Sequence, residues 1–284
     1  MKIIQSHSLI NNNGSYGFHY KKKYWRLSIY VFLLSYLCLK EYYGSVTIYT
    51  DEHGYDKLIK HIPYDEIIIK ENKFKDEKYL WSNYKTSVIE DIGEPFIHVD
   101  NDVFIFDDLF GDFIKSDKHD IIVQDFLDIN NPLGIVDEFI SENATILREN
   151  NLMLDNFEYG FYSGGVIGMK ELSTIKKYSN LVNEILELYD KNILKNADKL
   201  IAAMSEEFGL YLTSLKYGFN VYPILPIKMV KKFGRFETAN KVKYTHLWGQ
   251  SKYNDKYIDL VKKKTINKYP EFTDLVNNIQ YIKF

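Results

Sequence analysis

The first half of the chain alternates short apolar, β-branched runs with longer segments that have helical spacing. The runs predict strands at residues 2–5, 46–50, 66–69, 95–99 and 120–124. The segments between them predict helices at residues 26–43, 54–61 and 78–91. The first of these helices is apolar nearly all round, which indicates burial on most faces. Strands separated by helices form βαβ units, so we predict an α/β fold with a mostly parallel central sheet flanked by helices.

The second half is less regular but continues the same kinds of element. A glycine-rich strand is expected at residues 164–169 and a late strand at residues 220–224. Helical spacing is found at residues 175–189, 208–215 and 254–268, and Gly218 is expected to end the second of these helices. No repeat, low-complexity linker or Pro/Gly-rich seam interrupts the chain, which favours a single domain over residues 1–284.

Composition and charge exclude several classes of protein. The 284 residues are 45% hydrophobic and 26% charged, which is typical of a globular chain with a real core. A net charge of −3 gives no general basic field, so we expect no nucleic-acid partner. Cys38 is the only cysteine, which excludes an internal disulfide and fits a reducing compartment, so a cytoplasmic location is expected.

Membrane insertion is also not expected. The start of the chain lacks the pattern of a signal peptide. The most apolar stretch, Ile29–Leu39, has about half of the roughly 20 residues that a spanning helix needs. Two lysine runs, Lys21–Lys23 and Lys262–Lys264, fit solvated faces best and leave peripheral membrane or phosphate contact as the minor reading.

Two acids stand at the end of the fourth predicted strand. In Asp100-Asn101-Asp102, a tight turn would aim both carboxylates to one side, and a second apolar run, Val103–Phe106, follows. Asp and Asn also favour ordinary turns, so the pair alone is weak evidence. Burying two acids between apolar runs is unfavourable unless something pairs with them. Mg²⁺ and Mn²⁺ prefer such oxygen ligands, and ligands in parallel sheets bind beyond the carboxyl ends of strands.

Three motifs in order resemble the family 8 glycosyltransferases, which have the GT-A fold. Phe96–Phe106 resembles their strand–DxD–strand element, and Ser163–Met169 resembles the Asn/Ser-Gly/Ala-Gly-Val element that lines their sugar pocket. His246-Leu247-Trp248-Gly249-Gln250-Ser251-Lys252 resembles their C-terminal His-x-x-Gly-x-x-Lys element, although Tyr253-Asn254 replaces the usual Pro-Trp. The resemblance implies a nucleotide-binding half at residues 1–106 and an acceptor half with the metal and phosphate loop at residues 107–284.

The resemblance also implies roles for individual residues. Asp100, Asp102 and His246 would bind Mn²⁺ or Mg²⁺, and Lys252 would contact the diphosphate of the donor beside Gly249. A lone histidine is more often packed in a core, but Gly249 and Lys252 downstream favour the ligand reading. The expected substrate-binding loop is Ser163, Gly164 and Gly165.

Further contacts to the donor are expected from residues at the ends of the first two strands and in the helix before the DxD strand. The candidates are Gln5 and Ser6 at the end of the first strand, Asp51 at the end of the second strand, and Lys85 in the helix before the DxD strand. Asp51 serves equally well as a turn acid, and Lys85 as a solvated lysine. Asp155 and Glu158 are weaker acidic candidates.

Glu206 and Glu207 are the candidate catalytic residues. In the resembling family an acidic or amide pair at this place faces the transferred sugar and the acceptor. If the helix extends upstream through Ile201, Glu207 lies on the flank of its apolar stripe and Glu206 nearly opposite, toward water. If Ser205 caps the helix instead, both acids only complement the helix dipole.

The sequence thus predicts a metal-dependent glycosyltransferase that moves a sugar from a nucleotide-diphosphate donor, with a UDP-sugar preferred, to a glycan or other acceptor. The family resemblance implies retention of configuration, although DxD motifs also occur in inverting enzymes. One alternative is a nucleotidyltransferase, for which Asn12–Gly17 is a poor phosphate loop. The other is a catalytically silent module that binds a sugar or a nucleotide.

Overall fold

The structure is a computed structural model that describes residues 1–9, 22–74, 77, 79–80, 82–128, 134–154, 160–198, 200–247 and 254–282. Within these residues, seven strands form the main sheet in the order β10-β6-β9-β4-β1-β2-β3. They are β1 (Lys2–His7), β2 (Val46–Thr50), β3 (Glu66–Ile69), β4 (Phe96–Val99), β6 (Ile121–Val123), β9 (Val166–Met169) and β10 (Val221–Pro223). The pairs β1–β2, β2–β3 and β10–β6 are parallel, and β6–β9 is antiparallel. The predicted α/β fold with a mostly parallel sheet is confirmed.

The chain divides into two compact units that interleave along the sequence. Unit 1 comprises residue 1 and residues 79–97 and 110–238, and unit 2 comprises residues 2–78, 98–109 and 239–284. The boundary passes through β4, between Ile97 and His98. The single domain over residues 1–284, with halves that meet at residue 106/107, stays a prediction.

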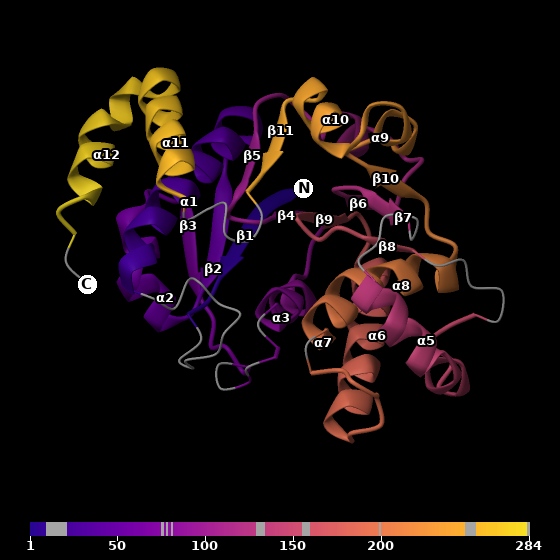
Figure 1. Ribbon diagram of the computed structural model, residues 1–284. Helices are drawn as coiled ribbons and strands as arrows, with labels where there is room; N and C mark the ends of the chain where they lie inside the picture. Colours follow the sequence, from indigo (N-terminus) through magenta and orange to yellow (C-terminus); the bar gives the residue numbers. More distant parts are fainter. Residues whose placement is uncertain are drawn as a thin grey trace. The chain divides into compact units, whose positions relative to one another are not determined.

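Unit 2 contains the long helix α1 (Lys22–Tyr43), which is buried at every position from Ser28 to Leu39. This burial confirms a helix without a solvent face over most of its length. Gly44 ends α1 with a φ of +81°, a backbone conformation that glycine adopts without steric cost. The C-terminal helices α11 (Asp255–Lys268) and α12 (Thr273–Ile279) pack against α1 (Figure 1).

The second helix of unit 2 differs in its bounds from the prediction. It forms as α2 (Glu52–Lys57), followed by a separate 3₁₀ turn at Ile59–His61. Asp51 is its N-cap, and the Asp51 carboxylate accepts a hydrogen bond from the backbone N–H of Gly54. A two-stranded antiparallel ladder of β5 (Val103–Ile105) and β11 (Tyr244–His246) completes the part of unit 2 that concerns the site.

Unit 1 is mostly helical around β6, β9 and β10. Helix α3 begins at Asn83, later than predicted, and the side chains of Ser82 and Asn83 donate hydrogen bonds to the Ala202 carbonyl and the Ser205 hydroxyl. Several further elements of unit 1 and its border were not predicted from the sequence. They are the pair β7 (Phe126–Asp128) and β8 (Gly160–Tyr162), and the helices α4 (Gly111–Lys115), α5 (Gly134–Glu149), α9 (Ile227–Phe233) and α10 (Arg235–Lys241). The described residues contain no helix with the length and apolarity that crossing a membrane requires.

One helical segment of unit 1 carries the candidate catalytic acids. Helix α7 (Ile201–Ala203) runs without a break into a π-helix at Met204–Phe208 and then into α8 (Gly209–Tyr217). The upstream extension through Ile201 is therefore confirmed, and the alternative in which Ser205 caps the helix is wrong. Ser205 lies inside the segment, where its hydroxyl donates to the backbone carbonyl of Ala202. Helix α6 (Leu172–Asp190) packs against this segment.

Candidate active site

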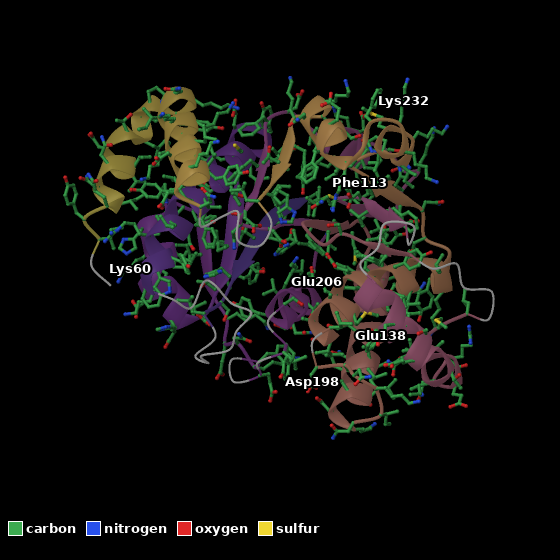
Figure 2. All side chains as sticks on the ribbon, viewed as in Figure 1. Lys60, Phe113, Glu138, Asp198, Glu206 and Lys232 are labelled. Atoms are coloured by element: carbon green, nitrogen blue, oxygen red, sulfur yellow. The ribbon has the colours of Figure 1, made fainter. Side chains whose placement is uncertain are left out.

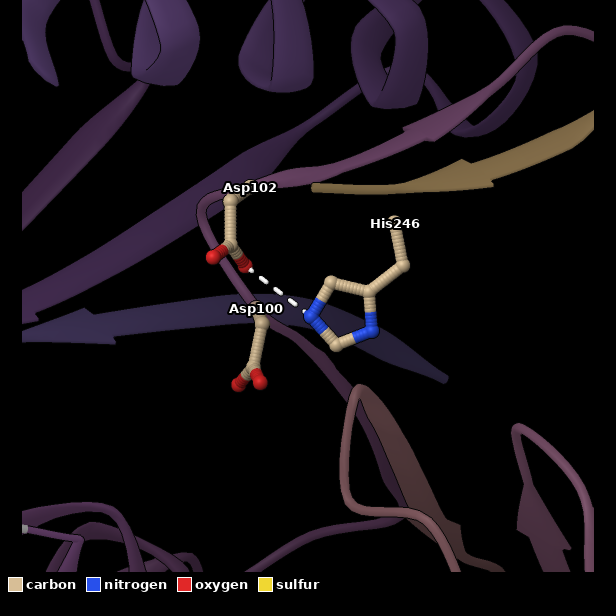
Figure 3. Close-up of side chains that lie close together, drawn as sticks. All are labelled: Asp100, Asp102 and His246. Atoms are coloured by element: carbon tan, nitrogen blue, oxygen red, sulfur yellow. Dashed lines mark ion pairs between the residues drawn. The ribbon is translucent and has the colours of Figure 1, made fainter. Parts of the chain in front are cut away.

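The predicted metal ligands come together in unit 2. One ligand atom from each of Asp100, Asp102 and His246 lies within 4.8 Å of the other two. Nε2 of His246 is 3.3 Å from Oδ1 of Asp102, and Figure 3 shows the imidazole facing the two carboxylates. Two carboxylates and one imidazole form a set of ligands that suits Mn²⁺ well, and the carboxylate oxygens of this set also suit Mg²⁺. The residues present therefore fit a divalent cation.

Chain topology explains why residues so far apart in sequence meet here. Strand β4 ends at Val99, and the backbone N–H of Val103 donates to the carbonyl of Asp100, which closes a tight turn. The chain then enters β5, and β11 pairs with β5 so that His246 lies opposite Val103. The backbone N–H of Leu247 donates to the carbonyl of Asp102, which extends this pairing to the turn itself.

Buried polar side chains fix the turn in place. Nε2 of Gln5 donates to the Ser35 hydroxyl at 2.9 Å and to the Asp100 carbonyl at 3.3 Å, while Ser35 donates to the Val103 carbonyl. The Asn101 side chain donates to the carbonyl of Ser6. These contacts keep the turn, and with it the two carboxylates, in one conformation, because the turn cannot change shape without breaking buried hydrogen bonds.

His98 supports the same site, although no role for it was predicted from the sequence. It is fully buried, its Nε2 lies 2.8 Å from the hydroxyl of Ser6, and its Nδ1 lies 3.8 Å from Oδ1 of Asp100. The sequence spacing could have indicated this contact, because residues two apart in a strand point to the same side. His98 and Asp100 have this spacing along and just beyond β4.

The other predicted donor contacts in unit 2 have structural partners. Gln5 accepts a hydrogen bond from Tyr64 and contacts the DxD turn, and Asp51 caps α2 and accepts from the Ser8 hydroxyl. The turn-acid interpretation of Asp51 is thus confirmed, whereas donor contacts by Gln5, Ser6 and Asp51 stay predictions. Gly249, Lys252 and Trp248 lie outside the described residues, as do Asp155, Glu158, Trp81 and the Asn12–Gly17 loop.

Unit 1 gathers the predicted sugar loop and both candidate acids. Lys85 donates from Nζ to Oε1 of Glu206 at 2.5 Å and to the carbonyl of Gly164 at 2.9 Å. The side chains of Lys85 and Glu206 are only 11% and 6% exposed, so the solvated interpretation of Lys85 is wrong. Glu207 accepts a hydrogen bond of 2.7 Å from the backbone N–H of Gly164.

The predicted orientation of Glu206 is also wrong. It was expected to face water, but it is buried, whereas Glu207 is half-buried. The expectation assumed 3.6 residues per turn, and the π-helix at Met204–Phe208 has the wider i→i+5 turn, which rotates the two acids relative to the apolar stripe. Figure 2 labels Glu206 in this part of unit 1.

Gly164 lies against both acids. A Cβ atom at this position would overlap the carboxylate of Glu206 and lie 3.3 Å from the side chain of Glu207. The two glutamate side chains therefore lie too close to the backbone at position 164 for any residue larger than glycine. Burial raises the pKa of Tyr178 well above its ordinary value, and the charges of Glu206 and Glu207 add to the effect.

Arg235 fixes the other side of the loop and was not predicted from the sequence. Its Nε and Nη2 bind the two carboxylate oxygens of Asp125 at 2.5 and 3.0 Å, and Nη2 also donates to the hydroxyl of Ser163 at 3.1 Å. Asp125 is 1% exposed, and its carbonyl accepts from the backbone N–H of Ser163. A planar guanidinium can make this set of contacts, and a lysine ammonium cannot.

We expect Arg235→Lys to lower the free energy of unfolding by about 1.5–3 kcal/mol, because an ammonium cannot reproduce both guanidinium contacts to the buried carboxylate of Asp125. The midpoint of urea unfolding measures this loss. Lys191→Gln is the matched control, because it breaks an exposed ion pair with Glu187 and should cost less than about 1 kcal/mol. Equal midpoints in the two variants would contradict the assignment.

Comparisons with known proteins give one family and several solved structures. A model of a family of unknown function (DUF6734) matches residues 1–279, and no curated protein matches the chain. An active-site mutant of LgtC is 11% identical, with a TM-score of 0.41 and coverage of 74% of this chain and 71% of that chain. LgtC is a galactosyltransferase.

Two further solved structures are similar to the chain. Mouse xyloside xylosyltransferase 1, in its apo form, is 12% identical with a TM-score of 0.42, and the match covers 86% of this chain and 96% of that chain. The glycosyltransferase GlyE of Streptococcus pneumoniae TIGR4 is 9% identical with a TM-score of 0.39, with 85% and 49% covered.

Proposed function

The chain belongs to DUF6734, a family of unknown function, and we propose that it is a metal-dependent glycosyltransferase that uses a nucleotide-diphosphate sugar. The observation that supports this proposal best is the Asp100/Asp102/His246 group at the end of β4. Two buried or half-buried carboxylates in one turn are unfavourable without a compensating charge, and a divalent cation would supply it. When bound, such a cation neutralises the charge of a leaving diphosphate.

In this proposal, the residues of unit 2 hold the diphosphate end of the donor. Asp100 and Asp102 supply carboxylate oxygens to the cation, and His246 supplies an imidazole nitrogen. We assign Lys252 to the diphosphate and Gly249 to close backbone approach, on the strength of the His-x-x-Gly-x-x-Lys spacing. The hydrogen bonds from Gln5, Ser35 and Asn101 keep the turn in its binding geometry.

The residues of unit 1 act on the sugar. We assign Ser163, Gly164 and Gly165 to sugar binding, with Lys85 and Arg235 holding the loop from either side. Glu206 forms a buried ion pair with Lys85, whereas Glu207 is half-buried and accepts a hydrogen bond from the backbone N–H of Gly164 in the sugar loop. We propose that Glu207 stabilises the positive charge that develops at the sugar carbon as the bond to the diphosphate breaks.

A panel of nucleotide sugars with Mn²⁺ tests the proposal, with released nucleoside diphosphate as the signal. We expect release from at least one UDP-sugar, even with water as the only acceptor, and no release after the metal is removed with a chelator. Calorimetry on the same panel separates the alternatives. Metal-dependent binding of a nucleotide sugar without turnover would identify a silent binding module, and the absence of any binding would refute the proposal.

A further inference from the structure

Two adjacent acids in unit 1 contact one glycine, and both acids lie in the π-helix at Met204–Phe208, which we call the π turn. The carbonyl of Gly164 accepts a hydrogen bond from Lys85, and Lys85 also donates to Glu206. The backbone N–H of Gly164 donates to Glu207. Both backbone groups of this glycine are therefore held, directly or through Lys85, by consecutive residues of one helical turn.

The geometry of a π-helix explains how consecutive residues can do this. Successive side chains on an α-helix point about 100° apart, so neighbours normally face different surroundings. The wider i→i+5 turn of a π-helix holds more residues in each turn, which brings the directions of neighbouring side chains closer together. Because such turns are rare in helices, contacts from neighbouring elements are expected to stabilise this one.

Two buried side chains from neighbouring helices supply such contacts. Helices α3 (Asn83–Asp91) and α6 both pack against the π turn, which follows α7 in Figure 1. The hydroxyl of Tyr178 in α6 donates to the backbone carbonyl of Glu206 at 3.3 Å. Nδ2 of Asn83 donates to the hydroxyl of Ser205 at 2.9 Å. Tyr178 is 1% exposed, and Asn83 and Ser205 are fully buried, so a change in the shape of the turn would leave buried polar groups without their partners.

The backbone of the π turn shows why the tyrosine matters. The N–H of Gly209 divides its hydrogen bonding between the carbonyl of Met204, five residues back, and the carbonyl of Glu206, three residues back. The Glu206 carbonyl thus shares this donor with Met204, and the Tyr178 hydroxyl provides a second one. This hydroxyl bonds to the point of the turn from which the Glu206 side chain extends toward Lys85.

We propose that Tyr178 and Asn83 are positioning residues that hold the π turn and, through it, hold Glu206 and Glu207 at Gly164. The link to catalysis rests on the proposed function, in which Glu207 acts on the sugar. The structural part stands apart from that function, because the contact between Glu207 and the Gly164 N–H exists without any substrate. Loss of the Tyr178 hydroxyl should therefore loosen a contact that this hydroxyl does not itself make.

Proton exchange at the amide of Gly164 tests the structural part. This N–H donates to Glu207, so its exchange with solvent reports how often that contact opens. Ser163-Gly164 is the only Ser-Gly pair in the sequence. Serine labelled at its carbonyl carbon, combined with glycine labelled at its nitrogen, therefore isolates this one amide in an NMR spectrum. Glu207→Ala, which removes the acceptor, gives the full effect for comparison.

The test variants are Tyr178→Phe, which removes one hydroxyl and keeps the buried ring, and Asn83→Ala. They act through different helices, so either variant tests the proposal where the other does not fold. Tyr189→Phe is the matched control, because Tyr189 is also in α6 but its hydroxyl donates to Asp198 at 3.2 Å, outside the π turn. Melting temperatures establish that each variant is folded.

Tyr178→Phe and Asn83→Ala should each speed up exchange at Gly164 by roughly fivefold, because one hydrogen bond typically changes an equilibrium by about that factor. The effect should be smaller than that of Glu207→Ala, and Tyr189→Phe should show none. Unchanged exchange in a folded test variant would overturn the proposal for that residue. Equal acceleration in Tyr189→Phe would indicate general loosening of α6 and would overturn the role of Tyr178.

Turnover of a nucleotide sugar tests the link to catalysis. Tyr178→Phe should lower kcat by roughly fivefold with little change in the KM of the donor, because the position of Glu207 matters chiefly in the transition state. Faster exchange at Gly164 with an unchanged kcat would overturn this link. If the unmodified chain releases no nucleoside diphosphate from any donor, the proposed function fails, while the exchange experiment still decides whether Tyr178 and Asn83 hold the π turn.

Discussion

Asp102→Asn is expected to reduce Mn²⁺-dependent binding of UDP by more than the ten- to hundredfold that changes to outer-shell partners usually cost. The substitution keeps the shape of the side chain but removes the charge that the cation needs. Asp102 supplies one of the three ligand atoms within 4.8 Å, and its Oδ1 is 3.3 Å from Nε2 of His246. Two remaining protein ligands cannot hold the cation as firmly.

The same variant should fold normally, and this separates a ligand from a packing residue. The contact of the Asp102 backbone with Leu247 does not depend on the side chain, and the removal of one carboxylate relieves repulsion from Asp100. Without metal, the melting temperature should therefore be no lower than that of the unmodified protein. Calorimetry of UDP with and without Mn²⁺ measures the first expectation, and thermal unfolding measures the second.

Asp107→Asn is the matched control for this prediction. Asp107 is also in unit 2, five residues further along the chain, but it is exposed and pairs with Lys243 at 3.0 Å. Its replacement should leave metal-dependent binding unchanged, because an exposed ion pair makes only a small contribution. Unchanged binding in Asp102→Asn would remove the Asp100/Asp102/His246 group from the proposed mechanism.

Local patterns in the sequence were sufficient for much of unit 2 and for the central sheet. The β-branched runs at residues 46–50 and 66–69 form strands with the predicted bounds, because strand preference and the flanking breakers are properties of neighbouring residues. The DxD turn was recognised for the same reason. The end of an apolar strand and the two acids that follow it are visible within one short stretch of sequence.

The remaining parts of the site depend on contacts between distant residues. Arg235 meets Asp125 across 110 positions and Lys85 meets Glu206 across 121, and no periodic pattern reports such pairs. The orientation of Glu206 was mispredicted because the π-helix changes the residue spacing per turn. Helix α9 gave no clear signal, since its apolar residues are not packed on a core and so follow no simple amphipathic pattern.

Glu207→Gln is expected to reduce turnover on the order of a hundred- to a thousandfold, the usual cost of removing one group that stabilises transition-state charge. The amide oxygen of glutamine can still accept the hydrogen bond from Gly164, so the sugar loop keeps its support. What is lost is the negative charge beside the developing positive charge. The affinity for the donor should change little, because that interaction matters chiefly in the transition state.

Glu206→Gln distinguishes this role from a purely structural one. Glu206 forms a buried ion pair with Lys85, so Glu206→Gln removes an opposite charge from beside a buried ammonium and should lower the melting temperature clearly. Glu207 is half-buried, and a glutamine at this position can keep the hydrogen bond from the backbone N–H of Gly164, so Glu207→Gln should melt closer to the unmodified protein than Glu206→Gln does. Single-turnover release of nucleoside diphosphate measures the chemical step, and calorimetry measures donor affinity. Full turnover in Glu207→Gln would remove this residue from catalysis, because the change leaves the backbone contact in place and alters only the charge.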